Sequence, residues 1–185
     1  MNVKKIIRFI CLIAIPFYLS CFWGCAGAPH AEKGRKIICD QLADQVMMQY
    51  NYLESIRLHE AFLEQYPLHP LALYHLGYLY GQLQDYEKEV EFYEDAITLG
   101  FYTGNIFFNL GMAYGELERM EEAIGAFKRG LVQKSNNPDL HLGLGMALQK
   151  MGLFEQAEDE YKTVIGLDPD NKDAIEYLER VKELK

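Results

Sequence analysis

A Leu-Gly pair recurs at a fixed interval through the middle of the chain, and this interval constrains the fold more than any other feature. Leu76-Gly77, Leu110-Gly111 and Leu144-Gly145 follow one another at two equal intervals of about 34 residues. A unit of this length cannot bury its apolar face alone, so neighbouring units must stack against each other. The sequence therefore predicts an extended array of similar units.

Helix start signals indicate that each unit is a pair of helices. Asn137-Pro138 places a capping residue before a proline at the first helical position, and His69-Pro70 repeats the arrangement with a weaker cap. We expect helices near residues 36–49, 52–66, 70–83, 86–99, 104–117, 120–134, 138–151, 154–167 and 171–184.

Over residues 70–169 the unit resembles the tetratricopeptide repeat, whose pattern sets Leu-Gly, Tyr, Ala, Phe and Pro at fixed offsets. The resemblance implies an all-α superhelical solenoid of about four helix-turn-helix repeats, near 36–69, 70–103, 104–137 and 138–171, with a polar capping helix at 171–184. The first repeat matches weakly, with His59 at the Phe place. The residues that match the pattern and are expected to have structural roles are Gly77, Gly111, Gly145, Ala123, Ala157 and Pro169.

One position departs from the pattern in the second repeat. Glu89 stands where the family has Ala, which puts the close helix contact at that place in question. Together with Glu87, Glu91 and Glu94, it is expected to form a solvated helix face.

In the family that the chain resembles, the first helix of each pair lines a concave groove. Positions spaced three, four and three residues apart lie on one face of a helix, so each first helix presents a stripe of such positions to the groove. The expected groove residues are Tyr74, Tyr78, Phe108, Asn109, Met112, Leu142 and Met146. An exposed apolar stripe of this size marks an interaction site, whereas a covered one is ordinary core, and the sequence leaves both readings open.

Some family members hold chaperone C-termini in a carboxylate clamp of Lys, Asn and Arg. Asn109 alone has a suitable residue type among the comparable positions here. The groove is therefore expected to take a hydrophobic or aromatic segment, and its methionines would adapt to a peptide or helix.

The first 25 residues have the layout of a secretory signal. Lys4, Lys5 and Arg8 precede an apolar stretch and then small residues around two cysteines. Gly24-Cys25-Ala26 resembles the cleavage box of bacterial lipoproteins, with Ser20-Cys21 as the second choice. The alternative is an uncleaved signal anchor in the inner membrane, because the apolar stretch approaches the ~20 residues that span a bilayer. Residues 26–35 are expected to form a tether to a repeat domain at 36–185.

Charge excludes one class of partner. The net charge is −9 and becomes −12 if residues 1–25 are removed, because they carry three basic and no acidic residues. Nucleic-acid binding needs clustered Lys and Arg, so we expect none.

We also expect no enzyme, metal or cofactor. The chain lacks the Gly-x-Ser-x-Gly motif, a phosphate loop and a dinucleotide fingerprint, and its histidines show no metal-ligand spacing in the sequence. His59 and His141 fall at repeat core positions.

These features predict a membrane-tethered protein-interaction scaffold of the bacterial envelope, with envelope proteins as partners. It resembles tetratricopeptide lipoproteins that assist assembly of envelope machines. Ala26 after the proposed lipidated cysteine favours the outer membrane, facing the periplasm. The alternatives are a binder of a small apolar ligand or lipid and an accessory subunit of an envelope enzyme.

Overall fold

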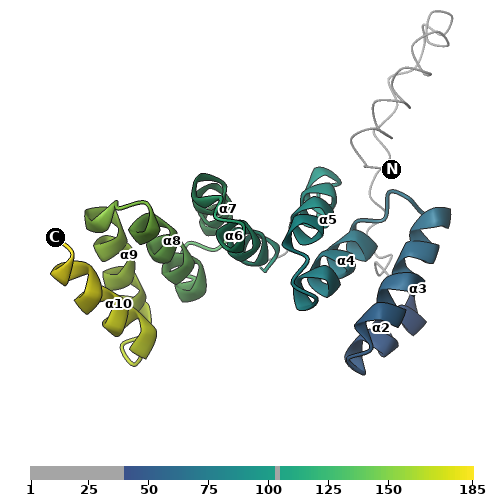
Figure 1. Cartoon of the computed structure of the whole chain (residues 1–185), viewed down its shortest axis with the longest axis horizontal. Helices are drawn as coiled ribbons and strands as arrows, with labels where there is room; N and C mark the ends of the chain where they lie inside the picture. The colour runs from purple at the N-terminus through teal and green to yellow at the C-terminus, as the bar shows by residue number, and fades with distance from the viewer. Residues whose placement is uncertain (1–39, 103–104) are drawn as a thin grey trace, which may run out of the picture.

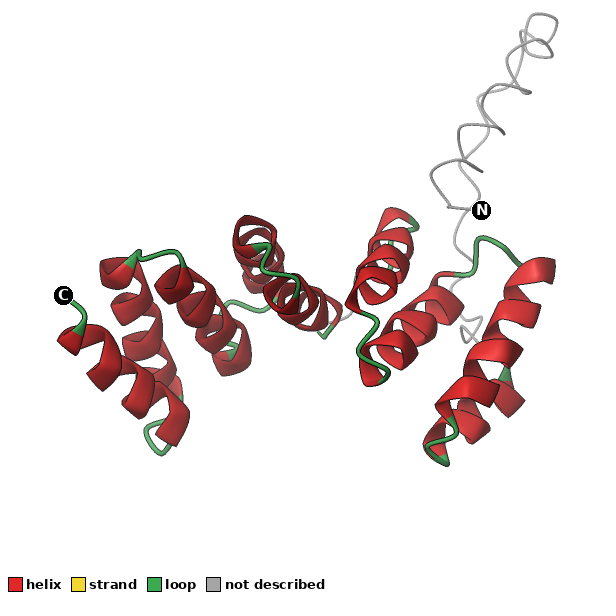
Figure 2. Ribbon diagram, in the orientation of Figure 1, coloured by secondary structure: helices red, strands yellow, loops and turns green. Residues whose placement is uncertain are grey.

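The computed structural model describes residues 40–102 and 105–185, and across these ranges it contains helices and no strand. The elements are α2 (Gln41–Met48), α3 (Tyr52–Gln65), α4 (Pro70–Gln82), α5 (Tyr86–Thr98), α6 (Ile106–Glu116), α7 (Met120–Gln133), α8 (Pro138–Lys150), α9 (Phe154–Leu167) and α10 (Lys172–Glu183). They follow one another in chain order along a single row (Figures 1 and 2). The predicted all-α solenoid is confirmed.

Each helix packs mainly on its neighbours in the sequence. The pairs α2–α3, α4–α5, α6–α7 and α8–α9 form the four units, and α10 lies against α9. Ala174 and Val181 of α10 are buried, while its charged residues, including the Glu176–Arg180 ion pair, face outward. This polar outer surface closes the C-terminal end of the array.

Polar caps fix where several helices begin. The Asn137 side-chain oxygen accepts hydrogen bonds from the backbone amides of Asp139 at 2.9 Å and Leu140 at 3.2 Å. His69 Nδ1 accepts from the Ala72 amide at 3.3 Å, a longer bond. Pro70 and Pro138 occupy first-turn positions, where no amide donor is needed.

The turn inside each pair repeats with the same period. Tyr50, Gln84, Glu118 and Gly152 occupy the same place in the four successive units and have positive φ angles of 60°, 60°, 57° and 75°. This left-handed conformation ends the first helix and turns the chain into the second. Only one of the four positions carries glycine, the residue that suits it best.

Close contacts between glycine and an aromatic ring join the two helices of each later pair. Gly77 faces Tyr93, Gly111 faces Phe127, and Gly145 faces Tyr161. In all three cases an added β-carbon would lie 2.6 Å from a ring atom. Glycine at these places lets the aromatic ring pack directly on the neighbouring backbone.

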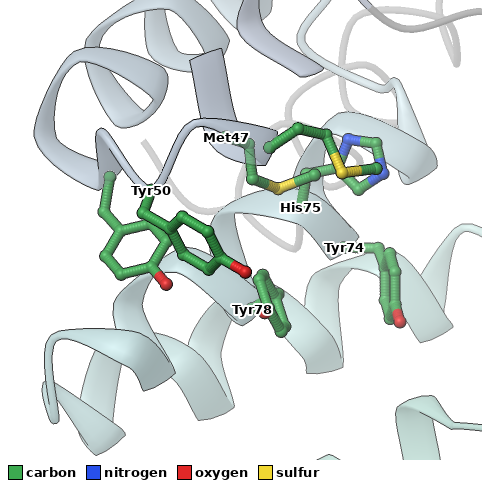
Figure 3. A pocket seen from close by; sticks show the side chains of 7 residues that line it. Met47, Tyr50, Tyr74, His75 and Tyr78 are labelled. Carbon is green, nitrogen blue, oxygen red and sulfur yellow. The ribbon is translucent and has the colours of Figure 1, made fainter. Parts of the chain in front are cut away.

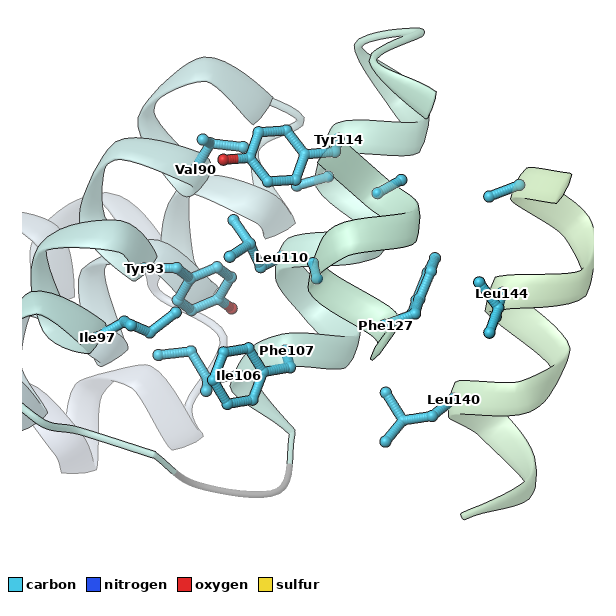
Figure 4. Close-up of a cluster of buried hydrophobic side chains, with 14 of the residues drawn as sticks. Val90, Tyr93, Ile97, Ile106, Phe107, Leu110, Tyr114, Phe127, Leu140 and Leu144 are labelled. Atoms are coloured by element: carbon cyan, nitrogen blue, oxygen red, sulfur yellow. The ribbon is translucent and has the colours of Figure 1, made fainter. Parts of the chain in front are cut away.

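The main hydrophobic core lies between the first and second helices of the later pairs and between neighbouring pairs. Figure 4 shows Tyr93 near Leu110 and Phe127 near Leu144, and all four side chains belong to one buried cluster. Ala123 and Ala157 are fully buried. Pro169 lies exposed in the turn between α9 and α10.

The N-terminal signals fall outside the described residues. Cys21, Cys25, the proposed signal at 1–25 and the tether at 26–35 precede residue 40. Among the helices of the described part, none has both the length and the apolar character needed to cross a bilayer.

Candidate ligand-binding groove

The seven predicted groove residues lie on the first helices of three consecutive pairs, α4, α6 and α8. Tyr78 and Met112 are each 36% exposed. The other apolar members are half-buried and pack against the core: Tyr74, Phe108, Leu142 and Met146. The stripe is therefore exposed at Tyr78 and Met112 and packed against the core at its other apolar members.

Three hollows follow this face and share lining residues. Tyr78 lines both the hollow beside α2 and the hollow between α4 and α6. Met112 and Glu116 line the second hollow together with a third, which lies between α6 and α8 and also contacts Met146. The shared residues place the three hollows next to one another along this face, which we call the groove.

Asn109 is tied to the core rather than free to clamp a carboxylate. Its side-chain amide donates to the Tyr93 hydroxyl at 3.0 Å, across the boundary between two repeats. Burial, the largest cause, raises the pKa of Tyr93 and keeps its hydroxyl neutral.

Glu89 corrects one of the sequence-based expectations. It is not solvated, because only 8% of the residue is exposed. Its carboxyl group lies against Gly81, where an added β-carbon would be 2.7 Å from the carboxyl carbon. Burial raises the pKa of Glu89 to about 7. Because Gly81 has no side chain, it leaves room for the Glu89 carboxyl group, which is larger than the Ala that the family has at this position.

The Glu89 carboxyl group also lines the hollow between α4 and α6. Tyr78, Tyr86 and Glu116 line the same hollow, and within residues 40–102 and 105–185 no Lys or Arg does. A carboxylate among aromatic rings favours a cationic guest, because ring faces and the carboxylate both attract positive charge. The departure from the Ala pattern was the only sequence signal for this residue.

Beside α2 the groove ends in a hollow of about 300 Å³. Its lining residues are Met47, Met48, Tyr50, Tyr52, Tyr74, His75 and Tyr78. Figure 3 shows Tyr50, Tyr74 and Tyr78 along one side of this space, with Met47 and His75 above them in this view. Flexible thioethers and aromatic rings make a surface suited to apolar groups.

A polar cluster lies behind this end of the groove, at the junction of α2, α3 and α4. Asp44, His59 and His75 each offer a possible metal-ligand atom, and these atoms lie within 4.8 Å of one another. Burial, the largest cause, lowers the pKa of His59 to about 4 and also lowers that of His75. Both imidazoles are therefore neutral near pH 7.

Comparisons with known proteins agree with this architecture. Two family models described as "Tetratricopeptide repeat" match residues 116–181 and 71–99. The chain therefore contains tetratricopeptide repeats, and its described residues fold as a tetratricopeptide solenoid. No curated protein sequence matches significantly.

Among solved structures, the MamA protein superposes with a TM-score of 0.74 and 20% identity, over 77% of this chain and 78% of that one. YrrB, described as a TPR protein with an unusual peptide-binding site, gives 0.66 and 19%, over 77% and 82%. The second TPR domain of human RPAP3, in complex with the HSP70 peptide SGPTIEEVD, gives 0.57 and 23%, over 61% and 98%. At these identities the likeness concerns the fold.

Proposed function

We propose that this protein is a non-catalytic scaffold that binds a segment of another protein in the groove of α4, α6 and α8. The observation that carries the proposal is the row of three adjoining hollows around the exposed side chains of Tyr78 and Met112. Exposed apolar surface of this kind typically marks an interaction site. Peptide binding by structural relatives such as YrrB and the RPAP3 domain supports it.

The groove favours a segment with apolar anchors and one basic side chain. Glu116 supplies negative charge in the hollow between α4 and α6, Glu89 adds to it as the pH rises through about 7, and Tyr78 and Tyr86 supply ring faces. The peptide bound by the human RPAP3 domain ends in the acidic sequence EEVD. A peptide of that type would meet like charge here, so we expect a different ligand chemistry.

We further propose that the protein is lipidated at Cys25, with Cys21 as the alternative, and tethered in the bacterial envelope. The support is the N-terminal sequence, with its basic start, apolar stretch and Gly-Cys-Ala boundary. The outer membrane, facing the periplasm, is the proposed location, and envelope proteins are the proposed partners. An inner-membrane signal anchor is the alternative.

Site-specific photo-crosslinking in intact cells tests the groove. A photoreactive amino acid at Met112 is expected to capture one discrete protein partner. The matched control places it at Val132, which is 84% exposed on the second helix of the same pair and lines none of the three hollows. Replacement of Tyr78 by Ala should reduce the crosslink at position 112. Equal capture at both positions would contradict the proposal.

Metabolic labelling with palmitate tests the tether separately. Labelling should disappear in Cys25→Ala and persist in Cys21→Ala. The reverse result moves the lipidation site to Cys21, and labelling of neither the wild type nor the variants favours the signal anchor.

The hollow beside α2 supports a second candidate function, the binding of a small apolar molecule or lipid. Its volume of about 300 Å³ is at the lower end of the range for small-molecule sites. Protein purified from the envelope in mild detergent distinguishes the two functions. A stoichiometric protein partner supports the scaffold, whereas an extractable lipid removed by Tyr78→Ala supports the second.

A further inference from the structure

Three helices bring one carboxylate and two imidazoles together at the N-terminal end of the array. Asp44 comes from α2, His59 from α3 and His75 from α4. Asp44 Oδ1 lies 2.9 Å from His75 Nδ1 and 3.6 Å from His59 Nε2. The imidazole centroids are 5.2 Å apart with 61° between their planes, so the rings do not stack face to face.

The ligand atoms are shielded from water. His59 is fully buried, and the side chain of His75 is 14% exposed. Asp44 is the outermost member, with 34% of its side chain exposed, although its Oδ1 is buried. A charge or a polar atom in such a place is costly unless hydrogen bonding or metal coordination compensates it.

Comparison between repeats shows that this cluster replaces ordinary packing. His59 and His75 are the equivalents, one period earlier, of Tyr93 and Asn109, which are joined by a single hydrogen bond. At the boundary between the first and second repeats, two imidazoles thus occupy a pair of positions that are in contact one period later. Asp44 adds an oxygen ligand. Its equivalents in the later repeats are the groove residues Tyr78, Met112 and Met146.

We propose that Asp44, His59 and His75 bind a divalent transition metal, with Zn²⁺ as the best fit. Two imidazoles and a carboxylate are ligands that Zn²⁺ accepts, and three protein ligands leave a fourth position open. A tetrahedral ion with bonds near 2.0–2.1 Å sets its ligand atoms roughly 3.4 Å apart. The observed separations of 2.9 Å and 3.6 Å to Asp44 Oδ1 bracket that value.

The site has a route to solvent and a structural consequence. His75 also lines the hollow shown in Figure 3, and the exposed Met48 lines the same hollow. A bound ion would join α2 to the α3–α4 junction, where the repeat pattern is weakest. It would therefore fix the N-terminal wall of the groove relative to Tyr74 and Tyr78.

Zinc titration of the full-length chain in mild detergent tests the proposal. The protein is purified with a histidine-free affinity tag, stripped with a chelator and titrated calorimetrically with Zn²⁺. We expect saturation at one ion per chain and a higher melting temperature with the metal, because a ligand that binds only the folded state stabilises it. Absence of saturable binding overturns the proposal.

Two variants and one control assign the site. His59→Phe introduces the residue type of the repeat pattern, and Asp44→Asn changes the most exposed ligand. Each should weaken Zn²⁺ binding by more than about a hundredfold. Loss of a hydrogen-bond partner outside the coordination shell costs about 10–100-fold, and loss of a direct ligand should cost more. His141→Gln removes a different half-buried histidine paired with a carboxylate, Glu160, and should bind Zn²⁺ like the wild type. Unchanged affinity in both ligand variants, with helicity preserved by circular dichroism, would assign the binding elsewhere and refute the site.

Discussion

Gly111 of α6 lies directly against the ring of Phe127 in α7, so that a β-carbon added to the glycine would be 2.6 Å from ring atom Cε1. The same ring is equally close to Gly143 of α8. Phe127 is thus held between the first helices of two successive repeats, and it is 2% exposed. A buried ring confined on both sides has little room to move away from an added methyl group.

Gly111→Ala is therefore expected to destabilise the protein although alanine is the better helix former. Overpacking a core costs about 1–3 kcal/mol, and the gain in helix propensity offsets at most about 1 kcal/mol. We expect the free energy of unfolding to fall by roughly 1–2 kcal/mol, measured by chemical denaturation. Gly125 of α7 provides the control, because a β-carbon added there would have nothing within 4 Å. Gly125→Ala should raise stability by up to about 1 kcal/mol, so an equal sign for the two substitutions contradicts the packing argument.

Glu89 gives the protein a defined dependence on pH. Burial raises its pKa from 4.5 to about 7, so the folded state binds the proton more tightly than the unfolded state. The stability associated with this proton is fully present below pH 4.5 and is lost as the pH rises through 7. Glu89→Gln should therefore raise the free energy of unfolding at pH 8 by up to about 3 kcal/mol, with the difference from wild type shrinking toward pH 4.

The control for this prediction is Glu87→Gln on the same helix. Glu87 is exposed, so its replacement should change stability by less than about 0.5 kcal/mol at either pH. Urea denaturation at pH 4, 6 and 8 makes the comparison. A Glu89→Gln difference that stays constant across these values would show that desolvation of the carboxylate is not its cause.

The fold was predictable because the same local signals recur in successive repeats of the sequence. A Leu-Gly pair in each of three successive repeats and prolines at helix starts locate the helices, and the structure places Pro70 and Pro138 in first turns as expected. Local chemistry of this kind depends on neighbours in the chain, so it can be read without knowing the tertiary contacts.

Contacts between helices were less predictable. The burial of Glu89 depends on the missing side chain of Gly81, which lies one helix earlier, and a pattern of acidic residues on α5 resembles a solvated face. Likewise, Asp44, His59 and His75 are well separated in the sequence and meet only because α2, α3 and α4 pack together. Spacing rules for metal ligands on one helix or loop do not detect such a cluster.

Helix α8 should depend measurably on its capping residue. The Asn137 side chain accepts two backbone hydrogen bonds at the start of the helix, so Asn137→Ala leaves two amides without that partner. We expect a loss of about 1 kcal/mol in the free energy of unfolding, and Asn137→Asp should retain most of the stability. The neighbouring Asn136 makes no such cap, and Asn136→Ala serves as the control. A similar loss in both alanine variants would assign the effect to the loop rather than to the cap.

The repeated left-handed turn offers a test in which two equivalent positions should respond in opposite directions. Glu118 and Gly152 occupy the same place in successive repeats, with φ angles of 57° and 75°. A side chain costs about 1–2 kcal/mol in this conformation, and glycine avoids that cost at the expense of some unfolded-state entropy. Glu118→Gly should therefore raise the free energy of unfolding by about 0.5–1 kcal/mol, whereas Gly152→Ala should lower it by about 1 kcal/mol. Because Glu118 is exposed, loss of its side chain removes no core packing, and a destabilised Glu118→Gly variant would mean that backbone conformation does not control this turn.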